Sequence, residues 1–188
     1  RMQIAWEGMT FSGLPVKFIS DRQIKEGKLS NFKIVAVNAK HVDDFTFNAL
    51  IDFAAKGGTL LCQGDDALML NEFGIRVPER EKKLQIASRV AADFARNWFS
   101  AFENALSRHS IKPPIDVVGL DGQHIYGLEY RCAKDRDGKD LMYIVNFSKK
   151  PVIATIKGKN DWFDLITMSD KPSRLTLKPL DVLLLKAK

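Results

Sequence analysis

The chain has 188 residues, enough for one generous hydrophobic core or two small ones, and its 45% hydrophobic and 28% charged residues are ordinary for a globular protein. The net charge is +6, yet residues 1–112 carry 16 basic and 13 acidic side chains and residues 113–188 carry 13 and 10. Because both signs are interspersed and no basic block occurs, we expect no nucleic-acid partner. No apolar run approaches the ~20 residues of a membrane span, so we expect no membrane partner.

The chain start and the cysteines add a few constraints. No signal peptide is visible and the first residue is Arg1, so the sequence reads as a fragment of a longer protein, and its compartment stays open between the bacterial cytoplasm and periplasm. Cys62 and Cys132 lie in different expected domains without CxxC spacing, which disfavours a structural disulfide and a zinc site. We expect no cofactor and no metal.

The first elements in chain order are a helix and a strand. The helix has a core-facing side made of Ile4, Ala5, Trp6 and Met9. Gly13 is its expected stop, residues 15–20 (PVKFIS) read as a strand, and Ser20-Asp21 opens a short helix or turn. A helix with no strand before it is an odd start for a doubly wound sheet, so we expect that a preceding strand belongs to missing sequence.

Residues 32–66 predict a strand–helix–strand unit. Residues 32–38 and 59–62 are short apolar runs that suit buried strands. Asp43-Asp44 can cap a helix between them, and Gly57-Gly58 ends it because glycine adopts the left-handed conformation without steric cost. Two strands joined by such a helix run parallel, so the N-terminal part is α/β.

Two more helices are expected before the chain changes character. Asp65-Asp66 can cap a helix over residues 67–73, ended by Gly74. Residues 81–109 carry an apolar stripe at three- and four-residue steps, which predicts one helix of roughly 43 Å at ~1.5 Å per residue. That helix would bridge two modules, and Pro113-Pro114 would end it.

From residue 115 onward the pattern is that of an antiparallel β-sandwich. Residues 124–133 and 140–148 are strand-like and are separated by a loop with Asp137-Gly138, a strong hairpin signal. Further short runs follow, split by glycine and proline turns. We therefore predict three parts: an α/β domain over 1–80, a linking helix over 81–112 and a β-domain over 113–188.

Several stretches resemble glycoside hydrolases related to the family 42 β-galactosidases. They are GLPVKFISDRQI, FKIVAVNAKHVDDFTFNALIDFAAKGGTLL and NEFG in the first part and DGKDLMYIVNFSKKPVIATI, DLIT and LTLKPLDVLLLK in the second. The resemblance implies a flavodoxin-like, class I amidotransferase-like trimerisation domain, followed by a small β-domain. It further implies a non-catalytic C-terminal region that assembles and supports a catalytic TIM barrel lying upstream, as part of a homo-oligomer.

Cys62 raises a rival reading, a cysteine hydrolase of the amidotransferase type. It ends a strand at the edge where parallel sheets present functional groups. Such a nucleophile needs a strand-to-helix elbow and an activating histidine, but the context here is LLCQGDD, and His41, His109 and His124 have no amidotransferase-like surroundings. We therefore interpret Cys62 as a buried structural residue.

The acidic residues of the first part do not indicate a glycosidase site. That chemistry needs two carboxylates across a sugar, and Asp65, Asp66 and Glu72 invite the comparison. Helix capping explains Asp65-Asp66 more simply, as it does Asp43-Asp44. The Gly57-Gly58 pair lacks the spacing of a phosphate-binding loop. We expect no catalytic residue in this chain.

Aromatic residues supply the remaining candidates. Trp162 follows the turn KGKND and is the candidate sugar contact if the β-domain is instead a carbohydrate-binding module, although core filling explains most β-domain aromatics. The candidate interface consists of aromatic residues on two helices, namely Trp6, Phe94, Trp98, Phe99 and Phe102. Several of these exposed together would form a larger apolar patch than monomers usually show, so we expect self-association or a covering barrel.

Overall fold

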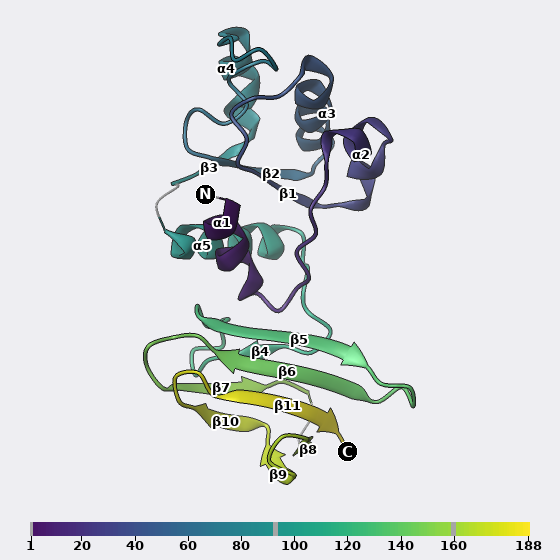
Figure 1. Cartoon of the computed structure of the whole chain (residues 1–188), viewed down its shortest axis with the longest axis vertical. Helices are drawn as coiled ribbons and strands as arrows, with labels where there is room; N and C mark the ends of the chain where they lie inside the picture. Colours follow the sequence, from purple (N-terminus) through teal and green to yellow (C-terminus); the bar gives the residue numbers. More distant parts are fainter. Residues whose placement is uncertain (1, 92–93, 159–160) are drawn as a thin grey trace. The chain divides into compact units, whose positions relative to one another are not determined.

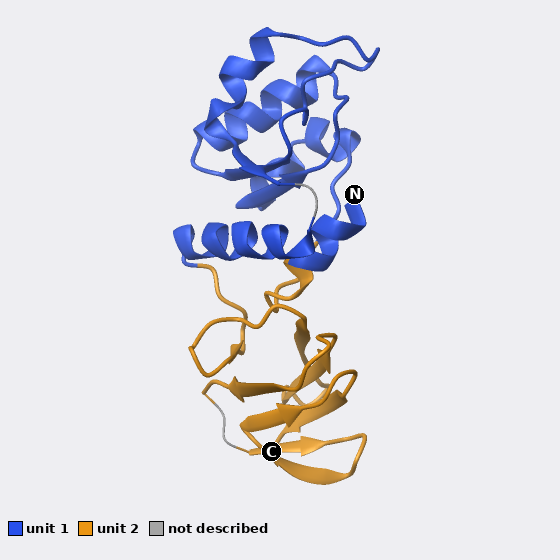
Figure 2. Cartoon of the chain, turned by 90° about the vertical axis from the view of Figure 1, so that its left-hand side faces the viewer, with its two compact units in different colours: residues 1–8, 17–110 blue, residues 9–16, 111–188 orange. Residues whose placement is uncertain are grey.

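A computed structural model describes residues 2–91, 94–158 and 161–188. It divides the chain into two compact units (Figure 2). The first contains the residues up to Gly8 together with Lys17–Ser110, and the second contains Met9–Val16 together with Ile111–Lys188. The chain thus enters the second unit early, returns to the first, and ends in the second, which a division into consecutive segments does not anticipate.

The first unit is built on a parallel three-stranded sheet in the order β1-β2-β3 (Figure 1). The strands are β1 Ile34–Val37, β2 Thr59–Gln63 and β3 Ser88–Val90. All five residues of β2 are buried, as expected for a central strand covered on both faces. This confirms the predicted parallel strand–helix–strand unit and the α/β character of this part of the chain.

The helix between β1 and β2 is α3, Asp44–Ala55. Asp43 is its N-cap, and the Asp43 carboxylate accepts a hydrogen bond from the Thr46 N–H at 2.7 Å. At the other end, Gly57 has φ +95°, a conformation that side chains other than glycine rarely adopt. The predicted cap at Asp43 and the predicted glycine stop at Gly57 are therefore both found at the ends of α3.

The other helices of this unit are short except for one. They are α1 Met2–Thr10, whose last two residues belong to the second unit, α2 Asp21–Lys25, η1 Lys28–Asn31, α4 Glu79–Lys83, η2 Leu84–Ile86 and α5 Ala95–Arg108. Ser20 and Gln23 form a capping box at the start of α2, in agreement with the predicted short helix. Figure 1 shows α3 and α5 on opposite sides of the sheet.

The single long helix predicted over 81–109 is wrong. Residues 79–90 form α4, η2 and β3, and only α5 is a long helix, with 14 residues. The reason is tertiary: β3 pairs in parallel with β2, and this pairing gives Val90 a buried place beside Gln63. The apolar residues of 84–91 and those of α5 happen to continue the same three- and four-residue spacing, so two separate segments looked like one helix in the sequence.

Two other local predictions are also wrong. Residues 15–20 form no strand with any described residue, since every strand of both units has other partners. Residues 67–73 form turns instead of a helix. Leu68 has φ +64°, and Leu70 makes isolated bridges to His41 and Arg76, so the chain runs as a compact loop that crosses the end of the sheet.

The second unit contains two antiparallel sheets, which confirms a β-domain after the α/β domain. One sheet has the order β10-β7-β4 and the other the order β5-β6-β11-β8-β9. The strands are β4 Val117–Val118, β5 Leu128–Lys134, β6 Asp140–Asn146, β7 Val152–Ile156, β8 Asp161–Asp164, β9 Ser169–Pro172, β10 Arg174–Leu177 and β11 Val182–Ala187. The predicted hairpin joins β5 and β6, with Gly138 at φ +77° in its turn.

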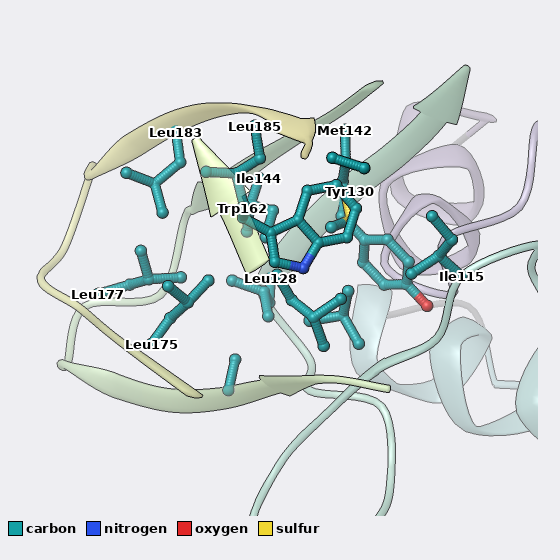
Figure 3. Packing of buried hydrophobic residues seen from close by; sticks show 14 residues of the cluster. Ile115, Leu128, Tyr130, Met142, Ile144, Trp162, Leu175, Leu177, Leu183 and Leu185 are labelled. Atoms are coloured by element: carbon teal, nitrogen blue, oxygen red, sulfur yellow. The ribbon is translucent and has the colours of Figure 1, made fainter. Parts of the chain in front are cut away.

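The two sheets share one hydrophobic core (Figure 3). Strands β6 and β11 alternate buried and more exposed residues, so that one face of the larger sheet points inward. Residues of both sheets meet there, among them Tyr130, Ile144, Trp162, Leu175 and Leu185. A packed layer of this kind between two antiparallel sheets is a β-sandwich.

Residues 9–16 are tied to the second unit by hydrogen bonds. The Arg131 guanidinium on β5 donates to the Thr10 carbonyl oxygen at 2.8 Å and also to the Thr10 hydroxyl. Gly13, at φ +74°, lies against the Tyr130 ring, where a Cβ would be 2.1 Å from a ring carbon. Only glycine allows both the backbone conformation and this close approach.

Candidate functional site

The carboxyl ends of the parallel strands, where α/β proteins usually place their sites, are closed by Arg80. This arginine is only 2% exposed, and its guanidinium donates to the carbonyl oxygens of Val42, Leu68 and Leu70 at 2.9–3.1 Å. It also pairs with Asp44 at 2.7 Å and lies 4.5 Å from the centre of the Phe47 ring. The cation therefore holds the loops after β1 and β2 in place, and sequence reading missed it because EREKK resembles a solvated charge run.

The acidic residues singled out in the sequence have structural partners. Asp43 caps α3 and pairs with Lys25 at 2.5 Å. The hydrogen bond from Lys25, followed by that from the Thr46 N–H, lowers the pKa of Asp43 to about 2. Asp44 pairs with Arg80, as described above. Both residues therefore stabilise the loop and helix start.

The second group of carboxylates forms no helix cap, because the helix expected after it is absent. Asp66 instead forms ion pairs with Lys40 at 3.0 Å and Arg76 at 3.8 Å. Asp65 and Glu72 are exposed side chains of the same loop. Within this loop, Asn71 accepts hydrogen bonds from the N–H groups of Phe73 and Ile75, so side-chain pairing and a tight turn give it its shape.

Cys62 is completely buried in the first unit's core. Burial raises the pKa of its thiol to about 11, which removes the thiolate needed for nucleophilic attack at neutral pH. No hydrogen bond joins its sulfur to another described residue, and the Arg89 charge only partly offsets the effect of burial. This geometry offers no activated nucleophile.

The three histidines make contacts with residues other than Cys62. His109 at the end of α5 shares a hydrogen bond of 2.9 Å with the Thr59 hydroxyl on β2. His124 lies 2.6 Å from the Asp116 carboxylate in the second unit. His41 makes an isolated bridge with Leu70. Each of these contacts fastens one segment of its own unit to another.

Trp162, the candidate sugar contact, is completely buried on β8. Its indole lies among the core residues of the sandwich (Figure 3). A sugar ring needs an exposed aromatic face to stack on, so the structure corrects this expectation and assigns Trp162 to the core. The cause is strand alternation, which turns Trp162 and Asp164 inward and leaves Phe163 half-buried.

The aromatic residues of the candidate interface differ in exposure. Phe94 and Trp6 are 69% and 40% exposed, whereas Phe99 and Phe102 are half-buried. Trp98 is completely buried, so it cannot contact a partner directly, which corrects its place among the interface residues. Its Cβ lies where α1 approaches α5, 2.7 Å from where a Cβ on Gly8 would stand.

The second unit holds a buried carboxylate that sequence reading also missed. Asp164 is fully buried and accepts hydrogen bonds from the Ile166 N–H, the Thr167 hydroxyl and the Leu184 N–H. Burial by itself would raise its pKa, but the three hydrogen bonds outweigh this effect and hold the pKa below its usual value. The residue organises the turn after β8, and its sequence context, DLIT, gave only a weak turn signal.

Strands β5 and β6 carry a polar group on the face away from the core. The Tyr143 hydroxyl donates to the Glu129 carboxylate at 2.6 Å, and burial together with this carboxylate raises the pKa of Tyr143 to about 12. Arg131 lies 4.0 Å from Glu129 and reaches Thr10. The group therefore joins the Met9–Val16 segment to the sheet.

Within residues 2–91, 94–158 and 161–188, no group of three or more acidic, histidine or cysteine side chains is arranged to hold a metal ion. No helix of the same ranges is long and apolar enough to cross a membrane. The polar clusters described above are each explained by contacts inside one unit.

No protein-family profile matches the sequence, and no curated protein matches it. Solved structures do resemble the fold. An exo-carrageenase of glycoside hydrolase family 42 from Bacteroides ovatus aligns with 100% of this chain and 26% of its own, with a TM-score of 0.65 and 19% identity.

Two β-galactosidases give similar alignments. Gan42B, a family 42 β-galactosidase from G. stearothermophilus, aligns with 98% of this chain and 35% of its own, with a TM-score of 0.69 and 12% identity. The β-galactosidase from Bacillus circulans sp. alkalophilus aligns over 98% and 37%, with a TM-score of 0.66 and 13% identity. The chain therefore has the fold of part of these enzymes and spans about a quarter to a third of their length.

Proposed function

We propose that this chain is a non-catalytic assembly and support module of a glycoside hydrolase related to the family 42 β-galactosidases. The observation that carries the proposal is coverage: 98–100% of this chain aligns with 26–37% of each larger family 42 chain. These alignments extend over both the α/β unit and the β-sandwich of this chain. The finer assignment of the first unit as a flavodoxin-like, amidotransferase-like trimerisation domain belongs to this proposal.

The polar groups of both units support a structural role. Arg80 and Asp44 close the strand ends of the first unit, and Asp164 is saturated by hydrogen bonds in the second. Glycoside hydrolysis needs two carboxylates facing one sugar, with space for the substrate between them. Asp66 is instead paired with Lys40 and Arg76 on a loop. The carboxylates of Asp44, Asp66 and Asp164 therefore stabilise the folded structure.

The proposed partners are a catalytic barrel and further copies of the same protein. Trp6 and Phe94 are the exposed aromatic residues among the candidate interface residues, and Phe99 and Phe102 on α5 are half-buried. Aromatic side chains of this kind are enriched at the energetic centres of protein interfaces. We assign the assembly surface to these four residues.

Two experiments test the proposal. The coding sequence upstream of Arg1 should encode a barrel with two glutamates at strand ends, and a different upstream domain would contradict the proposed parent. The purified chain should not hydrolyse a nitrophenyl galactoside. Turnover that disappears in Asp65→Asn or Glu72→Gln would show that the chain is itself catalytic.

The assembly surface has its own test. Replacing Trp6 by Ala together with Phe94 by Ser should weaken binding of the chain to the separately produced upstream domain, measured by calorimetry. Phe73→Ser is the matched control, because Phe73 is 79% exposed but lies on the loop after β2. Equal loss in the control, or no loss in the double variant, would remove this surface from the proposal.

A further inference from the structure

Gln63 is a buried polar residue at the carboxyl end of the central strand β2. Its side chain belongs to a residue that is only 7% exposed, and neither Oε1 nor Nε2 has a hydrogen-bond partner among the described residues. The backbone beside it is paired, since the Gly64 N–H donates to the Val90 carbonyl oxygen at 2.9 Å. Most buried polar side-chain atoms in proteins have a partner, so a buried carboxamide with neither atom paired needs a physical explanation.

The Gln63 side chain lies on the side of the sheet that α5 covers. Cys62 belongs to the core cluster that includes Phe47 of α3, and side chains alternate along a strand, so Gln63 faces the opposite side together with Thr59. On that side the Thr59 hydroxyl shares a hydrogen bond of 2.9 Å with His109, which directly follows α5. Figure 1 shows α3 and α5 on opposite sides of the sheet.

The first turn of α5 lies at the same edge of the sheet as Gln63. Gln63 is in register with Val90 of β3, and the carbonyl oxygen of the next residue, Ala91, accepts a hydrogen bond from the Asn97 side chain at 3.3 Å. Trp98 follows Asn97 and is completely buried, and its indole Nε1 also has no hydrogen-bond partner among the described residues. Two buried, unpaired polar side chains therefore occur on one side and at one edge of the sheet.

We propose that an internal water molecule is bound between β2 and α5, where it joins the Gln63 carboxamide to the Trp98 indole N–H. The carboxamide offers two donors and one acceptor, and the indole offers one donor. Water both accepts and donates, whereas a cation would serve only Oε1 and an anion only the N–H groups. The burial of both residues excludes a larger ligand. Buried waters typically make about three hydrogen bonds to polar groups that have no other partner.

This site does not depend on the proposed function, because residues of the first unit enclose it. Trp162 in the second unit provides a contrast. Its indole nitrogen also has no hydrogen-bond partner in the described part of the chain, but it lies within the hydrophobic core of the sandwich. A water molecule needs two to four polar partners, so the surroundings of Trp162 should be dry.

Nuclear magnetic resonance of the unaltered, ¹⁵N-labelled chain tests the site directly. The Trp98 indole proton should show a dipolar cross-peak with a water molecule that stays bound while the protein tumbles. The Trp162 indole proton should show none, and the indole proton of the half-exposed Trp6 should show only rapidly exchanging solvent. A Trp98 signal without such a cross-peak, or equal cross-peaks at Trp98 and Trp162, would overturn the proposal.

A substitution adds a second measurement. Gln63→Met keeps a side chain of similar volume but removes both polar atoms, so the Trp98 cross-peak should disappear. The unfolding equilibrium constant in urea should rise about tenfold, because the Trp98 N–H then lacks its acceptor. Leu61→Met, at a buried site on the same face of β2, is the control and should change that constant only a few-fold. A Gln63→Met chain that is more stable than the unaltered chain, as removal of an unpaired group predicts, or that keeps the cross-peak would overturn the proposal.

Discussion

Gly8 on α1 lies so close to Ala95 on α5 that a Cβ at Gly8 would be 2.2 Å from the Ala95 carbonyl oxygen. Within a helix glycine costs ~1 kcal/mol relative to alanine, so its presence here has a packing reason. The two helices of the first unit can approach only because this position has no side chain. The contact also buries Trp98, which is completely inaccessible.

Gly8→Ala should therefore destabilise the first unit, although alanine is the better helix former. We expect a loss of about 1–3 kcal/mol in the free energy of unfolding, since the backbone of α5 must shift. Urea unfolding followed by tryptophan fluorescence measures the change. Glu7→Ala is the control, because Glu7 is exposed on the same helix, and it should stay within about 0.5 kcal/mol of the unaltered chain. A stabilised Gly8→Ala chain would contradict the close packing.

Arg80→Met should lower the stability of the first unit by about 3 kcal/mol. The substitution leaves the carbonyl oxygens of Val42 and Leu68 without the donor that Arg80 supplies, and buried acceptors without partners are costly, whereas the Leu70 carbonyl oxygen still accepts from the Val42 N–H. Hydrogen exchange should quicken most in residues 64–77. Arg76→Met, which breaks only the 3.8 Å pair with Asp66 at a half-exposed site, should cost less than about 0.5 kcal/mol. Equal effects of the two variants would refute the role given to Arg80.

The pair Lys25–Asp43 predicts a dependence of stability on acid. The pKa of Asp43 is about 2 in the folded chain and 3.8 as the ordinary value, so the carboxylate contributes stability above pH 3.8 that is lost as the pH falls through 2. Asp43→Asn keeps the helix cap but loses the pair with Lys25. It should be less stable than the unaltered chain at pH 7 and equally stable near pH 2.

Urea unfolding between pH 7 and pH 2 checks this expectation. Asp43→Ala removes the cap as well and should lose about 1 kcal/mol at pH 7. Asp52→Asn, an exposed change on the same helix, should alter the free energy of unfolding at pH 7 by less than about 0.5 kcal/mol. A constant gap between Asp43→Asn and the unaltered chain across the whole pH range would show that the ion pair is not the cause.

The two cysteines should react with iodoacetamide in a fixed order. Cys62 is inaccessible and burial raises the pKa of its thiol to about 11, whereas Cys132 is only half-buried, although burial raises the pKa of its thiol too. Native protein at pH 7.5 should therefore be labelled at Cys132 first, and at Cys62 only after unfolding, as mapped by mass spectrometry. The Cys132→Ser chain should take up almost no label. Rapid labelling of Cys62 in the native state would revive the hydrolase reading.

Local sequence signals determined the parts of the fold whose partners are close in the chain. Asp43 and Gly57 mark the ends of α3, and the spacing between β1 and β2 requires their parallel order. Asp137-Gly138 forms the hairpin turn, and alternation along β6 and β11 defines the core face. In each case one segment's conformation depends on its own residues and near neighbours.

Tertiary structure decided the rest, because the partners are distant in sequence. Residues 88–90 are a strand because they pair with β2. Residues 67–73 are a loop in which the carbonyl oxygens of Leu68 and Leu70 accept hydrogen bonds from Arg80. Residues 9–16 joined the second unit through Arg131, which is 121 residues from Thr10. The burial of Trp162 depended on which face of β8 met the other sheet. The spacing of apolar residues shows which side of a segment is apolar, but only the assembled fold determines what that side packs against.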